Sequence, residues 1–149
     1  MASINKILVP TDFSDCSAVA FDKATELAGA LGAELTLLHI YEPPTYVGDV
    51  VVQMPGQEGL TVSEYIRAEA RHEMDAFLKE KSLPEGLTVH HRLEPGHHAT
   101  ALKKIAKEED FDLIVMGTHG RTGLAHALLG SVAEKLIRTA DVPVMVVRG

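Results

Sequence analysis

Three glycines and a serine lie near the carboxyl end of the chain, as Gly117-Thr-His-Gly120 and then Gly130-Ser131. Glycine lets the backbone approach a ligand closely, and the free amides at the start of a helix attract an anion. Arg121 adds a positive charge, and the Ser131 hydroxyl is able to donate to a phosphate or face a metal ion. This combination predicts a phosphate-binding loop. Glycines also serve simple turns, and these residues alone leave that alternative open.

Two common phosphate-binding motifs are absent from this stretch. No glycine is followed at the required interval by Gly-Lys-Ser/Thr, as a P-loop would need, and the segment from Gly117 to Gly120 lacks the intermediate glycine of the dinucleotide fingerprint. The glycines therefore define a different loop.

Two further side chains near the expected site have more than one interpretation. The Asp12 carboxylate follows the first apolar segment, where it could accept a ribose hydroxyl or hold Mg²⁺. Asp12 also suits the N-cap region of a helix, and the two roles are compatible. His119 lies between two of the glycines, but no partner carboxylate is identifiable, so a solvated loop histidine is preferred over a general base.

Cysteine and paired histidines offer weaker signals. The single cysteine, Cys16, excludes an intrachain disulfide and a thiolate-cluster metal site. A redox role competes with that of a small, partly buried filler, which is preferred. Adjacent strand residues such as His90 and His91 point to opposite faces and do not easily ligate one ion, so a metal site there is disfavoured and stays an open alternative. His97 and His98 are expected at a helix start, near the phosphate-side rim.

Alternating strands and helices must position these residues. The stretches Ile7-Leu-Val, Leu113-Ile-Val-Met and Val144-Met-Val-Val are continuously apolar, which is typical of parallel strands covered on both faces. The expected strands are Lys6 to Pro10, Glu34 to Tyr41, Leu87 to Leu93, Asp112 to Met116 and Val142 to Val147. The expected helices begin at Ser14-Asp15, at the capping box Thr61-Val-Ser-Glu64, at His97-His98 and after Ser131, and Gly32 ends the first of them.

This order predicts an α/β fold with a single doubly wound, five-stranded parallel sheet, strand order 3-2-1-4-5, and helices on both faces. In such a sheet a ligand lies beyond the carboxyl ends of the strands at the point where the winding reverses. That point falls between the first and fourth strands, so the segments after Val9 and after Met116 should meet there.

Composition limits the classes of protein. The chain has 149 residues, of which 46% are hydrophobic and 23% charged, so one globular domain spanning residues 1–149 is expected. No apolar run is long enough for a membrane span, and the amino-terminal residues lack a signal pattern, so we expect a cytoplasmic protein. The net charge of −7 opposes binding to nucleic acid or anionic lipid.

The spacing Gly117-x2-Gly120-x9-Gly130-Ser131 resembles the nucleotide signature G-x2-G-x9-G-S/T of the universal stress protein family. The opening Ile7-Leu-Val-Pro-Thr-Asp12-Phe-Ser and the closing Pro143-Val-Met-Val-Val are also similar to that family, so the resemblance covers the whole chain. It implies a small α/β domain, usually a homodimer, in which some members bind ATP. The site residues expected on this basis are Pro10, Thr11, Asp12, Ile40, Met116, Gly117, Thr118, His119, Gly120, Arg121, Thr122, Gly123, Gly130, Ser131 and Val132.

The resemblance also assigns parts of the ligand. Ile40 would contact adenine, Pro10 to Asp12 the base and ribose, and the glycines with Ser131 the ribose and phosphates. The leading hypothesis is an ATP-binding stress or signalling module, with Mg²⁺ (or Mn²⁺) and slow or no hydrolysis. A slow ATPase enzyme and an interaction protein with an unused pocket remain the alternatives.

Two segments are expected to contact other molecules. The last strand, Val142 to Val147, should form an exposed sheet edge, and pairing with the same strand of a second copy would produce a homodimer. The long connection from Glu42 to Gly59 is apolar enough to contact the base, a partner subunit or a protein client, and the sequence does not choose among them.

Overall fold

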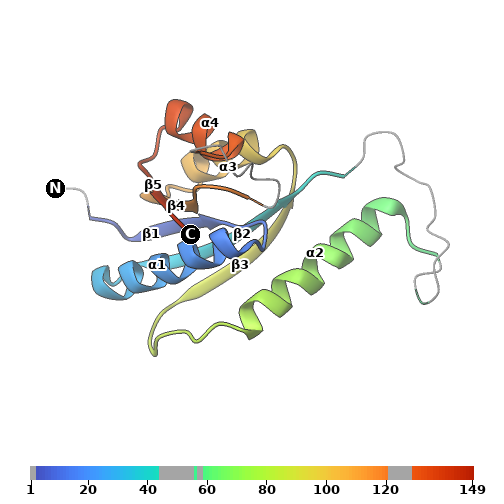
Figure 1. The fold of residues 1–149 in the computed structure, drawn as a ribbon, viewed down its shortest axis with the longest axis horizontal. Coiled ribbons are helices and arrows are strands. Elements are labelled where there is room, and N and C mark those ends of the chain that lie inside the picture. The colour runs from blue at the N-terminus through green and yellow to red at the C-terminus, as the bar shows by residue number, and fades with distance from the viewer. Residues whose placement is uncertain (1–2, 44–55, 57–58, 121–128) are drawn as a thin grey trace.

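The computed structural model describes residues 3–43, 56, 59–120 and 129–149 of the chain (Figure 1). The predicted site residues Arg121, Thr122 and Gly123 and most of the connection between Glu42 and Gly59 lie outside these ranges. The elements, in chain order, are β1 (Lys6–Pro10), α1 (Asp15–Leu31), β2 (Glu34–Tyr41), α2 (Val62–Lys79), β3 (Val89–Pro95), α3 (His98–Glu108), β4 (Leu113–Gly117), α4 (Ser131–Thr139) and β5 (Val144–Val147).

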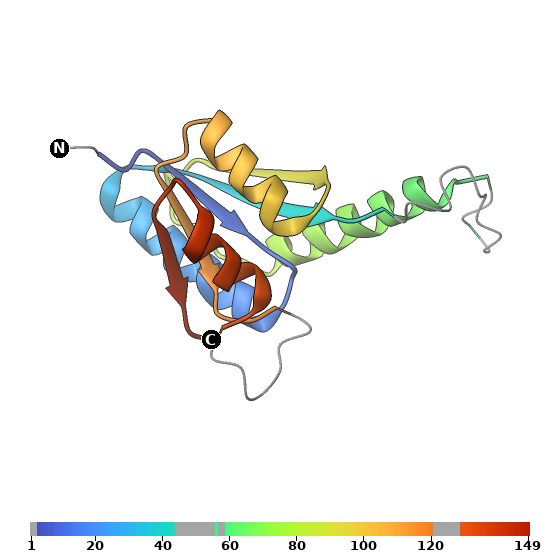
Figure 2. The same ribbon diagram turned by 90° about the horizontal axis from the view of Figure 1, so that it is seen from above.

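The strands form one parallel sheet in the order β3-β2-β1-β4-β5, which confirms the predicted topology. One apolar core packs α1 and α2 against the sheet through Phe21, Met74 and Phe77. A second core packs α3 and α4 through Leu102 and Leu136 (Figure 2). Because helices cover both faces, β1 and β4 are buried and need no polar alternation.

Three strand boundaries differ from the predicted ones. Strand β3 covers Val89–Pro95 rather than Leu87 to Leu93, because its pairing with β2 continues until Tyr41 lies opposite Pro95. Strand β4 is shifted by one residue and includes Gly117. Strand β5 begins at Val144 rather than Val142, after Pro143, which has no amide to donate to the ladder.

The predicted helix ends have the expected capping contacts. Ser14 caps α1 by accepting the Ser17 amide, and Gly32 ends that helix in the left-handed conformation with φ 68°. The Thr61 hydroxyl and Glu64 carboxylate form the reciprocal capping box of α2. The Thr61 backbone amide and then the Thr61 hydroxyl donate to Glu64, and these bonds lower the pKa of that carboxyl.

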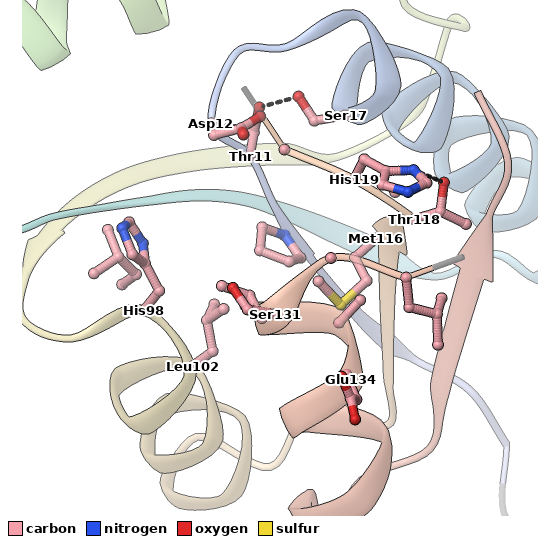
Figure 3. A pocket seen from close by; sticks show the side chains of 18 of the residues that line it. Thr11, Asp12, Ser17, His98, Leu102, Met116, Thr118, His119, Ser131 and Glu134 are labelled. Atoms are coloured by element: carbon pink, nitrogen blue, oxygen red, sulfur yellow. Dashed lines mark hydrogen bonds between the residues drawn. The ribbon is translucent and has the colours of Figure 1, made fainter. Parts of the chain in front are cut away.

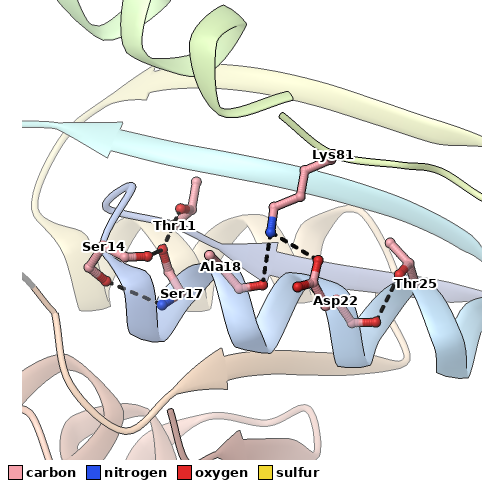
Figure 4. Close-up of polar contacts among 7 residues, drawn as sticks. All are labelled: Thr11, Ser14, Ser17, Ala18, Asp22, Thr25 and Lys81. Atoms are coloured by element: carbon pink, nitrogen blue, oxygen red, sulfur yellow. Dashed lines mark hydrogen bonds and ion pairs between the residues drawn. The ribbon is translucent and has the colours of Figure 1, made fainter. Parts of the chain in front are cut away.

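Helix α2 is attached to the rest of the fold mainly through its carboxyl-terminal half. Its amino-terminal half extends past the sheet (Figures 1 and 2), and its buried residues are Ala70, Met74 and Phe77. Just after the helix, the Lys81 ammonium lies 2.9 Å from Asp22 and 3.4 Å from the Ala18 carbonyl of α1 (Figure 4). The same ammonium lies 5.2 Å from the centre of the Phe77 ring. Lys81 therefore ties α2 to α1.

None of the helices within the described ranges combines the length and apolar character needed to cross a membrane.

Candidate functional site

A cavity of about 490 Å³ lies beyond the carboxyl ends of β1 and β4, where the winding of the sheet reverses (Figure 3). Its walls come from the β1–α1 loop, the carboxyl-terminal part of β2, the start of α3, the loop after β4 and the start of α4. Cavities that hold small ligands usually measure about 300–1,000 Å³, so this one has an appropriate size.

Most of the predicted site residues line this one cavity. They are Pro10, Thr11, Asp12, Ile40, Met116, Gly117, Thr118, His119, Gly120, Gly130, Ser131 and Val132. Seven further lining residues were not predicted: Ser17, Leu38, His98, Leu102, Leu129, Ala133 and Glu134. Leu38 could have been predicted, because side chains two residues apart on a strand lie on the same face and Ile40 was already expected at the site. His98 was expected only near the rim of the site, because its exact place depends on where α3 begins relative to β2.

The β1–α1 loop is held by its own side chains. The hydroxyls of Thr11 and Ser17 are 2.8 Å apart, and the Thr11 hydroxyl also accepts the Phe13 amide at 2.9 Å. Asp12 accepts the Ser14 amide at 3.0 Å, so Asp12 precedes the N-cap and supports it rather than serving as the cap. Phe13 takes the left-handed conformation, with φ 64°, which is unfavourable for a residue with a side chain. These contacts fix the turn that presents Asp12 to the cavity.

His39, on β2, supports the same loop. Its Nδ1 atom lies 2.7 Å from the Thr11 carbonyl oxygen, and because a carbonyl only accepts, Nδ1 carries the proton. The His39 ring also lies 4.5 Å from the ring of Phe13, which in turn lies 5.9 Å from that of Phe77 on α2. The loop is therefore packed between β2 and α2 as well as hydrogen-bonded.

The space around each site glycine explains why a larger residue would not fit. A Cβ on Gly117 would lie 2.7 Å from the Cys16 sulfur, and one on Gly120 would collide with the Asp12 carboxylate. A Cβ on Gly130 would lie 3.1 Å from the Thr118 carbonyl oxygen, which already accepts the Gly130 amide. The loop after β4 thus packs directly against the start of α1 and of α4.

Cys16 fills the space between this loop and the end of β5. Burial raises the pKa of its thiol, but hydrogen bonds from the His119 amide, from the Thr118 side chain and amide, and from the Gly149 amide together outweigh burial and lower it. The thiol is half-buried, as the preferred sequence interpretation expected. His119 is also half-buried rather than fully solvated, with Nδ1 3.0 Å from the Thr118 hydroxyl.

Two helices begin at the cavity, and their first turns differ. At α3 the Glu42 carboxylate, at the end of β2, accepts the His98 amide at 3.3 Å and lies 3.1 Å from His97 Nδ1. A negative charge therefore already lies at the positive end of α3. At α4 the N-cap is Gly130, which has no side chain to accept the first amides. Among the described residues no side chain caps α4, although Glu134 adds a carboxylate to its first turn.

Fold and site together define a doubly wound parallel α/β protein with a ligand-sized cavity at the switch point, lined in part by glycines. The sequence model of the Universal stress protein family matches residues 3–148, so the chain belongs to this family of stress-response proteins.

Individual relatives agree with this assignment. The chain is 36% identical over 146 residues to Universal stress protein MJ0531 of Methanocaldococcus jannaschii, which covers 96% of this chain and 81% of the relative. In structure it is similar to universal stress protein UspA from Lactobacillus plantarum, with a TM-score of 0.75, 28% identity, and coverage of 99% of this chain and 100% of that one. A universal stress protein in complex with cAMP is also similar, with a TM-score of 0.61, 28% identity and coverage of 98% of both chains.

Proposed function

We propose that the cavity binds an adenine nucleotide, ATP with Mg²⁺ (or Mn²⁺), and that the protein acts as a stress or signalling module switched by that nucleotide. The observation that carries the proposal is the meeting of the Gly117–Gly120 loop, Asp12 and the start of α4 around one cavity with Ile40 on its wall. The similar universal stress protein that holds cAMP, an adenine nucleotide, supports the same class of ligand.

The chemistry of the lining residues fits each part of this ligand. The uncapped amides of α4 and the close-packed glycines suit phosphates, while Ile40, Leu38 and Leu102 form an apolar surface for a base. Asp12 and Ser131 offer the carboxylate and hydroxyl oxygens that Mg²⁺ prefers, and Mg²⁺ usually binds one or two carboxylates together with nucleotide phosphates. A bound Mg²⁺ would neutralise phosphate charge there.

An equilibrium titration with ATP and Mg²⁺ tests the proposal. We expect a dissociation constant in the micromolar range or tighter (below about 10⁻⁴ M). Gly130→Val should abolish binding, because its side chain would strike the Thr118 carbonyl and block the start of α4. Gly29→Ala is the matched control, since Gly29 is exposed on α1 and has no atom within 4 Å of an added Cβ. Undiminished binding by Gly130→Val would place the nucleotide elsewhere, and a parent protein that binds none would favour the interaction protein.

Hydrolysis should be slow, with a turnover on the order of minutes or longer, because efficient phosphoryl transfer needs a positioned base. Both candidate bases already take part in contacts within the loops: His119 Nδ1 with the Thr118 hydroxyl, and Asp12 with the Ser14 amide. Measurement of released inorganic phosphate under multiple-turnover conditions tests this. Several turnovers per second in a preparation free of contaminating ATPases would favour the enzyme instead.

We also propose a homodimer formed through β5. This strand pairs with β4 on one side and is the last strand of the sheet. Met145 in β5 and Ile137 in α4 are large apolar residues with exposed fractions of 37% and 48%. Met145→Lys should shift the protein to a monomer in light scattering without unfolding it, whereas Val144 and Val146 pack on the core and make less clean test sites. A parent protein that is monomeric at high micromolar concentration would refute the dimer.

A further inference from the structure

His98 occupies a distinct position in the cavity. It belongs to the first turn of α3, and with Leu102 it forms the α3 wall (Figure 3). Thr118 and His119 lie at the opposite side of the same view. Among the described lining residues, His98 is the one with a polar side chain that α3 contributes, and its neighbours along this wall are apolar.

Glu42 fixes the position of His98. The Glu42 carboxylate oxygen that accepts the His98 amide also lies 3.9 Å from Nε2 of the His98 ring. The hydrogen bond to the backbone amide ties the start of α3 to the end of β2, close in sequence to Ile40, and the His98 ring lies beside the same carboxylate. The carboxylate additionally makes α3 an unfavourable place for phosphates, since like charges repel. Helix α4 also carries an acidic residue, Glu134, in its first turn, so charge alone does not separate the two helix starts. We place the phosphates at α4 because its cap, Gly130, has no side chain and adjoins the Gly117–Gly120 loop, and we place the base on the apolar wall formed by Ile40 and Leu102.

We propose that His98 recognises the nucleobase, by a hydrogen bond from its imidazole to the edge of a base that packs on Ile40 and Leu102. This inference rests on the nucleotide-binding function proposed above. A neutral imidazole has one donor and one acceptor, so it can pair with the ring nitrogens or exocyclic groups of a base, which aliphatic side chains cannot. One such neutral hydrogen bond changes affinity by about three- to tenfold.

The test compares nucleotides that share their ribose and phosphates but differ in the base. Dissociation constants for ATP, GTP and UTP are measured with the parent protein, His98→Ala, His98→Gln and His97→Ala. His97 is the matched control because it precedes His98, contacts the same Glu42 oxygen, has a side chain that is 87% exposed and does not line the cavity. We expect His98→Ala to lower the preference for ATP over UTP by about three- to tenfold, His98→Gln to restore part of it, and His97→Ala to leave it unchanged.

The other outcomes are equally decisive. An equal loss of affinity for all three nucleotides in His98→Ala would mean a contact to ribose or phosphate, and no loss would mean no contact; either result overturns the inference while nucleotide binding stands. A parent protein that binds none of the three overturns the proposed function itself. If His98→Ala fails to fold, NMR of the His98 ring in the parent protein decides: it should shift with ATP but not with inorganic triphosphate, and a ring unmoved by ATP would refute the role.

Discussion

Replacement of Gly120 by alanine tests the packing of the loop after β4 directly, without any ligand. The added Cβ would collide with one oxygen of Asp12, whose other oxygen accepts the Ser14 amide at 3.0 Å. Gly120 has no left-handed φ, so alanine is not strained by the backbone itself. The Asp12 side chain is flexible enough to rotate away, but rotation breaks its bond to Ser14. A hydrogen bond to a charged group contributes about 1.5–3 kcal/mol, and partial exposure of Asp12 reduces this to about 1–2 kcal/mol.

A double-mutant cycle measures this contact. Gly120→Ala, Asp12→Ala and the double variant are unfolded by urea in the absence of nucleotide. Asp12→Ala removes both the bond and the obstacle, so we expect each single variant to lose about 1–2 kcal/mol and the double variant to lose no more than Asp12→Ala alone. In thermal unfolding each single variant should melt roughly 2–8 °C lower. If Gly120→Ala is equally destabilising in both backgrounds, to within about 0.5 kcal/mol, the two residues are not in contact and the reasoning fails.

Four further expectations concern stability and reactivity. Gly29→Ala should raise the free energy of unfolding by about 0.5–1 kcal/mol, because Gly29 lies inside α1 with open space around it; chemical denaturation measures this, and a loss would contradict it. Lys81→Ala should lower the free energy of unfolding by about 1–2 kcal/mol, because the Lys81 side chain, which is 14% exposed, joins Asp22 to the Phe77 ring. Lys23→Ala removes an exposed ion pair and is the control; it should change the free energy of unfolding little. The pKa of Glu64 is lowered, so the stabilisation of α2 by its carboxylate is present above pH 4.5 and is lost as the pH falls through the lowered pKa. Amide exchange at the start of α2 should become faster over this pH range in the parent protein, and it should show no such pH-dependent change in Glu64→Gln. Because the thiol pKa of Cys16 is lowered, its alkylation by iodoacetamide should reach half its maximal rate below pH 9.0; a midpoint at or above that pH would contradict the hydrogen bonds around the sulfur.

Local sequence patterns were sufficient for the fold and for most of the residues that line the cavity. The apolar runs of β1 and β4 are short but uninterrupted, and the caps at Ser14, Gly32 and Thr61 act within a few residues, so both could be predicted. Topology then predicted where the ligand would bind, since only one pair of strands borders the point where the winding reverses. The single-domain organisation, the cytoplasmic location and the binding of ATP stay predictions.

The missed features depend on contacts between distant segments. His98 reaches the cavity because β3 continues to Pro95 opposite Tyr41, which brings the start of α3 beside Glu42. The sequence pattern ended β3 two residues earlier and expected His98 near the rim of the site, but it did not show which wall His98 would join; His98 lies on the side of the cavity away from Thr118 (Figure 3). Register between neighbouring strands is set by packing over the whole sheet, so no local pattern predicts it.

The glycines that suggested a nucleotide have two separate roles in this structure. Gly117 and Gly120 are favoured by the packing of the protein itself, because a Cβ at Gly117 would strike Cys16 and one at Gly120 would displace the Asp12 side chain, whether or not a ligand is bound. Gly130, as the side-chain-free cap of α4, is the glycine that leaves amides available to a phosphate. Packing within the protein is therefore one reason for glycine at the first two positions, and it is compatible with nucleotide binding at all three, since all three line the cavity.

This division changes how losses of binding must be interpreted. A variant at Gly117 or Gly120 lowers the stability of the free protein, so part of any loss of affinity reflects a displaced loop. Ligand-induced stabilisation separates the two effects, because it grows as RT ln(1 + [L]/Kd) and is referred to each variant's own unfolding free energy without ligand. A loop that is merely loosened should regain ATP-induced stabilisation when ATP is raised well above the weakened Kd, whereas Gly130→Val, which fills the space in front of α4, should gain none at any accessible concentration.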